Sequence, residues 1–287
     1  MKTNNVHIVK GGKESVKVLL LSDLHWDNPK CNRDLLKKHL NQALEEGCPI
    51  LLNGDTFCLM QGAYDPRKSK SDIRPEHNVN SYLDAVVNTA IEWFKPYAHL
   101  IKMVGYGNHE TSILKRQETD VIERFVAGLN REAGTEIEVG GYGGWVIFRF
   151  TFGSEGYKHK TGSFKLKYFH GAGGAAPVTK GTIQHNRMQT SVEGADAIWM
   201  GHVHNDYEVT YTVESLDSKF NVVLKDILMV RTSTYKEEYN KGKGGWHVER
   251  GAGPKPLGGR WLELHPYRNT SNGIDKVMVN AFTYKTI

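Results

Sequence analysis

The amino-acid sequence predicts an α/β fold, a four-layer α-β-β-α sandwich in which two stacked mixed sheets are flanked by helices. In the first half of the chain, apolar runs of strand length alternate with helical stripes, which is typical of a mostly parallel sheet with crossover helices. In the second half, strand patterns follow one another with few helical stripes between them, which indicates a second sheet packed on the first. No linker, repeat or low-complexity region is visible, so residues 1–287 are expected to form a single domain.

The first half holds three strand patterns and three helical stripes. Residues 16–22 are a mostly apolar run, which favours a buried strand. Leu36, Leu40 and Leu44 recur at four-residue spacing before Gly47, which predicts a helix that ends at this glycine. The expected strands are 16–22, 49–53 and 100–104, and the expected helices are 34–46, 83–94 and 121–129.

The second half is predicted to consist of strands and loops. The expected strands are 145–152, 164–169, 197–200, 207–213 and 220–230. The polar segment 61–80 is expected to be an inserted surface loop, which either shapes access to a site or is a passive excursion. The segment 241–260 contains seven glycines and is expected to be an irregular Gly-rich loop.

Composition and length limit the classes of function. The formal net charge is +5, from 37 basic and 32 acidic residues, which suits polyanionic partners without requiring them. The three cysteines fit no zinc or redox spacing, so we expect reduced thiols and a cytoplasmic location. Neither a signal peptide nor an apolar run of membrane-spanning length is visible, and no membrane association is expected.

Five short motifs in fixed order contain residue types that bind divalent metals, and most of them follow a predicted strand. They are Asp23-Leu24-His25, Gly54-Asp55, Gly107-Asn108-His109-Glu110, His170 and Gly201-His202-Val203-His204. Alternate residues of an extended chain share a face, so Asp-x-His and His-x-His each direct two side chains to one point. Ligands of parallel sheets bind beyond the carboxyl ends of the strands. The sequence therefore predicts a dinuclear metal site at the C-terminal ends of the strands.

These motifs resemble those of the calcineurin-like metallophosphoesterases, over residues 17 to 204. The resemblance implies two divalent metal ions, with manganese favoured and iron, zinc or magnesium as alternatives. It implies a first metal site made of Asp23, His25, Asp55 and His204, and a second made of Asp55, Asn108, His170 and His202. A hydroxide that bridges the two ions would attack phosphorus in line, and His109 would carry no metal but donate a proton or bind the phosphate.

Two departures favour particular branches of this family. The protein phosphatases usually carry Asp-Arg-Gly shortly after the Gly-Asp motif, whereas Thr56-Phe57-Cys58-Leu59 follows Asp55 here. That branch also tends to lack the paired Gly-His-x-His. The resemblance is therefore closest to the phosphodiesterases and DNA-repair nucleases, although the 83 residues after His204 leave little room for the cap domain of those nucleases.

The favoured function is a phosphodiesterase or nuclease that acts on nucleic acid or nucleotides, so that DNA or RNA is a candidate partner. One alternative is a phosphomonoesterase or protein phosphatase of the same superfamily, and a more remote one is a non-catalytic scaffold. The intact ligand set and His109 disfavour the scaffold. The oligomeric state is not predicted, because no stripe reads as a dimer surface.

Candidate substrate contacts are Asn108, Glu110, Arg67 and Lys180. Glu110 either supports His109 or caps the following helix, where an acid is favoured. Residues 156–192 contain no Asp or Glu but several Lys and Arg. In one interpretation they form a positive surface that attracts a polyanion. In the other, which is favoured, their lysines protect an edge strand.

Overall fold

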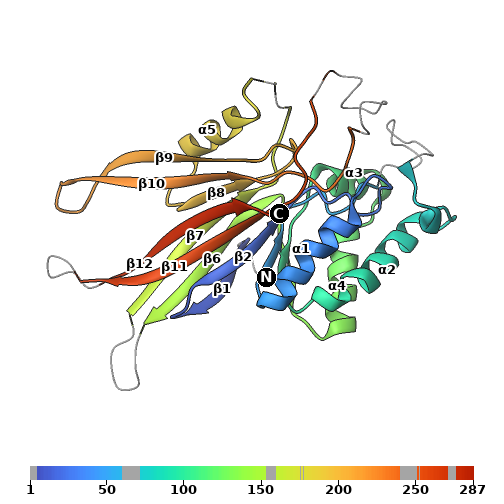
Figure 1. Ribbon diagram of the computed structural model, residues 1–287, viewed down its shortest axis with the longest axis horizontal. Helices are drawn as coiled ribbons and strands as arrows, with labels where there is room; N and C mark the ends of the chain where they lie inside the picture. Colours follow the sequence, from blue (N-terminus) through green and yellow to red (C-terminus); the bar gives the residue numbers. More distant parts are fainter. Residues whose placement is uncertain are drawn as a thin grey trace.

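Two six-stranded sheets form the centre of the molecule, with helices on their outer sides (Figure 1). The computed structural model describes residues 5–59, 72–152, 160–174, 176, 178–239, 251, 253–270 and 276–287. The predicted α-β-β-α sandwich is confirmed by this arrangement. No helix within the described ranges is long and apolar enough to span a bilayer.

Sheet I has the strand order β12-β11-β2-β3-β4-β5. Strands β2 to β5 are parallel, whereas β11 runs antiparallel to both of its neighbours. In β2, Leu19 and Leu21 pack toward the helices while Val18 and Leu20 pack toward the other sheet, which explains the continuous apolar run. The strands are β2 (Val16–Leu21), β3 (Ile50–Leu52), β4 (Ile101–Val104), β5 (Glu138–Val139), β11 (Arg260–Asn269) and β12 (Lys276–Lys285).

Sheet II has the strand order β1-β6-β7-β8-β10-β9. Its strand β7 is hydrogen-bonded to β6 on one side and β8 on the other, so the edges of the sheet are β1 and β9. The prediction that lysines of residues 156–192 protect an edge strand is therefore wrong for those in β7. The strands are β1 (Val6–Gly12), β6 (Gly143–Phe152), β7 (Lys160–Phe169), β8 (Ala197–Met200), β9 (Tyr207–Leu216) and β10 (Val222–Arg231).

The helices form the two outer layers. Helices α1, α2 and α4 bury their apolar stripes on sheet I, and α5 lies against β8, β9 and β10 of sheet II (Figure 1). Gly47 has φ 66° and ends α1 as predicted, because glycine adopts the left-handed conformation easily. The helices are α1 (Arg33–Glu46), η2 (Pro75–His77), α2 (Tyr82–Phe94), η3 (Lys95–Tyr97), α3 (Asn108–Gln117), α4 (Val121–Ala133) and α5 (Thr182–Ser191).

Several elements were not predicted from the sequence. Helix α5 has no apolar stripe, and α3 begins inside the Gly-Asn-His-Glu motif. Strand β1 and the β11–β12 pair were also missed. Of the two predicted loops, residues 60–71 and residues 240–250 and 252 lie outside the described residues, and residues 72–80 contain η2.

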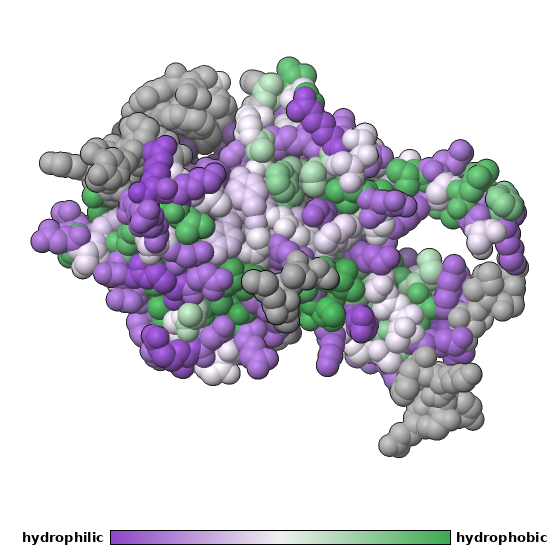
Figure 2. All heavy atoms as spheres, turned by 180° about the vertical axis from the view of Figure 1, so that it is seen from behind, coloured by the Kyte–Doolittle hydropathy of each residue, from purple (hydrophilic) through white to green (hydrophobic). Residues whose placement is uncertain are grey.

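The β9–β10 hairpin extends away from the rest of the molecule (Figure 1). Apolar side chains at its tip, including Leu216, Phe220 and Leu224, are exposed, and apolar residues are visible on the projecting end in Figure 2. The metal-binding motifs lie at the other end of these strands, where β10 and β8 run side by side.

Candidate metal centre

The five motifs meet at one end of the two sheets, because each begins one to three residues after the C-terminal end of a strand. Within sheet I, Asp23 N–H donates to Gly54 O (3.0 Å) and His25 N–H donates to Asp55 O (3.0 Å), which joins the loops after β2 and β3. Between the sheets, His202 N–H donates to the Asp23 carboxylate at 2.9 and 3.1 Å. Strand ends far apart in sequence therefore converge on one point.

The first cluster consists of Asp23, His25 and His204. One potential ligand atom from each lies within 4.8 Å of the others. His204 Nε2 is 3.4 Å from Asp23 Oδ1 and 3.3 Å from His25 Nε2. Two imidazole nitrogens and a carboxylate oxygen directed to one point suit a divalent transition metal.

The second cluster consists of Asp55, His170 and His202, again with one potential ligand atom of each within 4.8 Å of the others. His170 Nε2 lies 3.3 Å from Asp55 Oδ2. Asn108 stands next to this cluster, because the N–H of His109 donates to Asp55 Oδ1 (3.0 Å). The structure thus brings six of the seven predicted ligands into two clusters, with Asn108 next to the second in the chain, and it places Asp55 with the second cluster.

The hydrogen-bond partners of the histidines fit metal binding. His170 Nδ1 donates to Asn53 O (2.7 Å) and His202 Nε2 donates to Gly173 O (2.9 Å), so the opposite nitrogen of each ring is the one that would bind a metal ion. A backbone carbonyl that fixes the tautomer in this way is common behind metal-binding histidines. In addition, Asn108 Oδ1 and His202 Nδ1 are buried without a hydrogen-bond partner, which is costly unless a ligand satisfies them.

The protonation states of the site also favour metal binding. Burial lowers the pKa of His25 well below its ordinary value, and burial also lowers the pKa of His202. Both rings are therefore neutral, as metal ligands must be. Burial lowers the pKa of His170 as well, but the Asp55 carboxylate outweighs it and raises that pKa to about 10. Asp55 and His170 thus strongly favour a positive charge between them, which a divalent cation would supply.

The backbone of the ligands is strained. Asp23, His25, Asp55, His202 and His204 all have φ between 47° and 75°, a region that side chains with a Cβ rarely adopt. The left-handed conformation costs roughly 1–2 kcal/mol for each such residue. Strain of this kind persists where the surrounding structure enforces it and is frequent at functional sites. The concentration of strain on five ligands is an independent mark of this site.

His109 lies beside the clusters. Its Nδ1 donates to Cys58 O (2.5 Å), and its Nε2 is 3.9 Å from Asp55 Oδ2. Its ring packs edge-to-face on His25, with centroids 4.9 Å apart. His25, Cys58 and His109 form a further group with metal-ligand spacing, but burial raises the pKa of the Cys58 thiol to about 12, and a protonated thiol is a poor ligand.

Glu110 is turned to the backbone. One carboxylate oxygen accepts from the N–H groups of Gly107 (2.8 Å) and Asp55 (3.1 Å), and the other accepts from Phe57 N–H (2.9 Å). The side chain is 1% exposed, and burial and the charge of Asp55 raise its pKa to about 8. This geometry gives Glu110 a positioning role in place of the expected substrate contact, since it caps α3 and also holds the Asp55 loop.

The other expected substrate contacts are less centrally placed. Arg67 lies outside the described residues. Lys180 is exposed, and its carbonyl accepts from Asn205 Nδ2 (2.9 Å), directly after His204. The same Asn205 accepts from Lys255 Nζ (2.8 Å). Lys180 and Lys255 therefore form a basic rim next to the first cluster, of which the sequence predicted one member.

Arg231 was not predicted, although it supports the site. It is fully buried at the end of β10 and donates to the carbonyl of Gly201, to Tyr207 Oη (3.0 Å) and to Gln184 Oε1 (3.2 Å). It thereby fixes the start of the His-x-His segment against α5. The sequence does contain a signal for this residue, namely a cation at the end of an apolar strand pattern.

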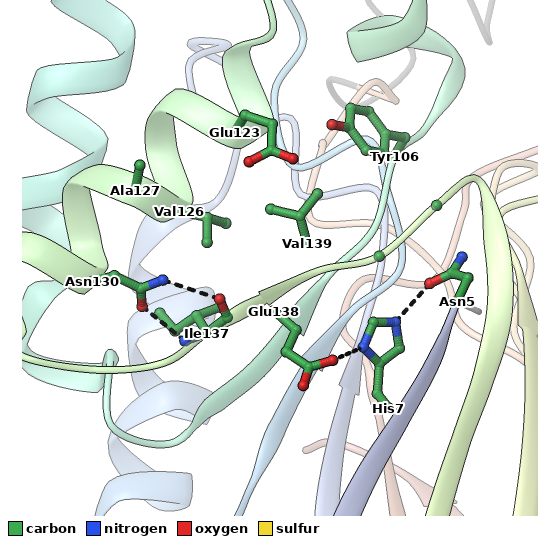
Figure 3. Close-up of a pocket in the computed structure, with 12 residues that line it drawn as sticks. Asn5, His7, Tyr106, Glu123, Val126, Ala127, Asn130, Ile137, Glu138 and Val139 are labelled. Atoms are coloured by element: carbon green, nitrogen blue, oxygen red, sulfur yellow. Dashed lines mark hydrogen bonds and ion pairs between the residues drawn. The ribbon is translucent and has the colours of Figure 1, made fainter. Parts of the chain in front are cut away.

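A separate cavity of about 620 Å³ lies between α4, β5 and β1 (Figure 3). Its polar side chains already have partners: His7 contacts Glu138 and Asn5, and Asn130 bonds to the backbone of Ile137 (Figure 3). None of the seven predicted metal ligands lines it. We therefore assign no ligand to this cavity.

Two sheets in an αββα sandwich with Asp/His clusters at the strand ends are consistent with a metallophosphoesterase sandwich that has candidate metal sites. No protein-family model matches the chain, and no curated protein matches it. Among solved structures, the chain is similar to one described as GAP50, the anchor in the inner membrane complex of Plasmodium. The identity is 11%, the match covers 95% of this chain and 89% of that chain, and the TM-score is 0.40. The function must therefore be argued from the site itself.

Proposed function

We propose that this protein is a metal-dependent phosphodiesterase that acts on nucleic acid or nucleotides. One observation carries the proposal: two Asp/His clusters converge at the ends of both sheets with ring nitrogens and an amide oxygen free to bind a cation. Asp23, His25 and His204 would hold one ion, and Asn108, His170 and His202 the other, with Asp55 shared between them. Manganese is the favoured metal, and iron, zinc and magnesium are the alternatives.

The bound ions would neutralise charge on a phosphoester and make water more acidic. The protein's own contribution is to hold the donors rigidly. The Asn53 and Gly173 carbonyls fix two histidine tautomers, and Glu110 fixes the peptide of Asp55. Ligands held in this way need little reorganisation when charge develops on the substrate, which is the main source of electrostatic catalysis.

His109 is suited to donate a proton to the leaving oxygen. Because its Nδ1 is bonded to Cys58 O, the proton available for transfer is on Nε2, which faces Asp55 and the site. The Cys58 carbonyl would stabilise the protonated ring. Histidine is the side chain used most often as a general acid in catalysis.

The preference for a diester rests on the sequence around the site. The segment Thr56-Phe57-Cys58-Leu59 replaces the Asp-Arg-Gly pattern of protein phosphatases, and His202 and His204 are paired. A phosphomonoesterase or protein phosphatase remains the second candidate. A non-catalytic scaffold is disfavoured because the ligand set and His109 are intact.

Metal content and substrate panels test the proposal. The purified protein, loaded with Mn²⁺, would be assayed on bis-p-nitrophenyl phosphate, p-nitrophenyl phosphate, and single- and double-stranded DNA. We expect about two metal ions per chain and turnover of the diesters. Cleavage of the monoester alone would contradict the diesterase, and no turnover with two metals bound would favour the scaffold. We also propose a cytoplasmic location, which three free, buried cysteines support.

A further inference from the structure

The outer side of sheet II is only half covered by helix. Helix α5 and the side chains around it pack on β8, β9 and β10, and Figure 1 shows α5 beside these strands. Trp145 and Phe169 border this cluster. Farther along the sheet, over β1, β6 and β7, outer side chains stand in solvent: Ile8 is 53% exposed and Val6 39%.

The pairing register shows which residues share this exposed face. Trp145 of β6 lies opposite Val6 and Lys167, and Ile147 lies opposite Ile8 and Lys165. Arg149 lies opposite Lys10 in the next row. We call the following residues the basic sheet face: Ile8, Lys10, Trp145, Ile147, Arg149, Lys165 and Lys167.

The charge of this face is one-sided. Strands β1, β6 and β7 contain no Asp or Glu at all, while four cations lie on the face. Asp196, at the border of the face, already has partners: it accepts from Lys165 N–H (2.7 Å) and pairs with Lys225 (2.7 Å). A run of cations on strands that carry no acidic residue suits a polyanion.

The face also offers a surface for stacking. Lys167 Nζ lies 5.3 Å from the centroid of the Trp145 ring, and Trp145 is half-buried on β6. Proteins that bind single strands combine cations that follow the backbone with aromatic rings on which bases stack. Sheet surfaces with exposed aromatic residues are used in this way for RNA.

The face leads to the metal centre. Lys165, Lys167 and Phe169 alternate along the outer side of β7, and His170 follows directly. Five residues of strand span about 16 Å, so Lys165 lies within a few nucleotides of the clusters. Tyr142 continues the path, with its ring 5.5 Å from Phe169 and 5.4 Å from His170.

We propose that the basic sheet face binds single-stranded nucleic acid and guides it to the metal centre. This inference rests on the proposed function and names its substrate class. The phosphates contact Lys10, Arg149, Lys165 and Lys167, and one base stacks on Trp145. A single strand fits better than a duplex, because the bases of a duplex are stacked on one another and are not available to stack on Trp145.

Binding of a fluorescein-labelled 20-residue oligo-dT, measured by fluorescence anisotropy in EDTA to prevent cleavage, tests the proposal. Each phosphate contact contributes about −0.7 to the slope of log Kobs against log salt for single strands, so four cations give about −2.8. The triple variant Lys10→Gln, Arg149→Gln, Lys165→Gln should reduce this slope to about −0.7 and weaken binding at 0.1 M salt by roughly 10- to 100-fold.

The matched control is Lys37→Gln, Lys38→Gln, Lys219→Gln, which removes three exposed cations elsewhere and should bind within about two-fold of wild type. Trp145→Ala should weaken oligo-dT binding several-fold and leave duplex binding unchanged. Equal binding by the face and control variants would overturn the proposal. So would a face variant that loses self-association in sedimentation while it keeps oligo-dT binding.

Hydrolysis of bis-p-nitrophenyl phosphate separates this inference from the proposed function. The small diester does not reach the face, so the triple variant should turn it over at the wild-type rate. If the wild type hydrolyses the diester but the face and control variants bind oligo-dT equally well, only the nucleic-acid role of the basic sheet face is refuted. Absence of turnover, with binding that still depends on the face, would refute the phosphodiesterase alone.

Discussion

Replacement of Glu110 tests whether its hydrogen bonds to the backbone hold the candidate metal centre in place. The carboxylate accepts three buried backbone N–H groups, from Gly107, Asp55 and Phe57. Glu110→Ala would leave all three without an acceptor. An unsatisfied buried donor costs about 1–3 kcal/mol, so we expect a loss of about 3–6 kcal/mol of unfolding free energy after partial relaxation.

For a domain of this size, about 1 kcal/mol lowers Tm by roughly 2 °C, so Tm should fall by about 6–12 °C. Glu110→Gln keeps the volume and one acceptor but turns an NH2 group toward a backbone N–H, so about half of this loss is expected. Both variants should also bind Mn²⁺ more weakly, because the Asp55 peptide is no longer fixed.

Calorimetry gives the Tm, and inductively coupled plasma mass spectrometry gives the metal content. Glu123→Gln is the matched control, because Glu123 is also an acid in the first turn of a helix but is exposed. It should cost at most about 1 kcal/mol through the helix dipole. A Glu110→Gln protein with wild-type Tm and metal content would refute the positioning role.

Three further variants probe the site and its surroundings. Asp55→Asn should lower metal content at both clusters, because the proposed role of its carboxylate is to serve both, and a protein with unchanged metal content would exclude the bridging role. His109→Ala should keep both metals while diester turnover falls roughly 100-fold or more, whereas metal loss would show that His109 is a ligand. Burial and the charge of Arg231 lower the pKa of His185 to about 3 from 6.5, so this residue opposes folding as pH falls from 6.5 toward 3. Between pH 7 and 4.5 the free energy of unfolding, measured in urea, should therefore fall by about 2–3 kcal/mol more for the wild type than for His185→Gln. Equal losses would show that His185 is not buried in the neutral form.

Local sequence patterns predicted the parts of the fold that bury one continuous stripe. The runs that became β2, β3 and β4 and the stripes of α1, α2 and α4 carry their own periodicity. Helix α5 has no apolar stripe, and its contact with sheet II depends on residues such as Met188 that do not repeat at helical spacing. Pairing of β11 between β2 and β12 joins residues over 200 positions apart, for which no local signal exists.

The candidate ligands were predictable because their chemistry is visible in the residue types, whereas their support is not. Arg231 stabilises the Gly201 carbonyl only because β10 and β8 end side by side, and a buried arginine cannot be told from an exposed one by its neighbours in sequence. The same holds for charge. The lysines of residues 156–192 were assigned to an edge strand, but strand order alone decides this, and β7 is an inner strand. An inner strand needs no protection against edge pairing. Lys165 and Lys167 on its outer face therefore need another explanation, and the proposed binding of a polyanion gives one, because Arg149 of the neighbouring β6 and Lys10 of β1 lie on the same side of the sheet.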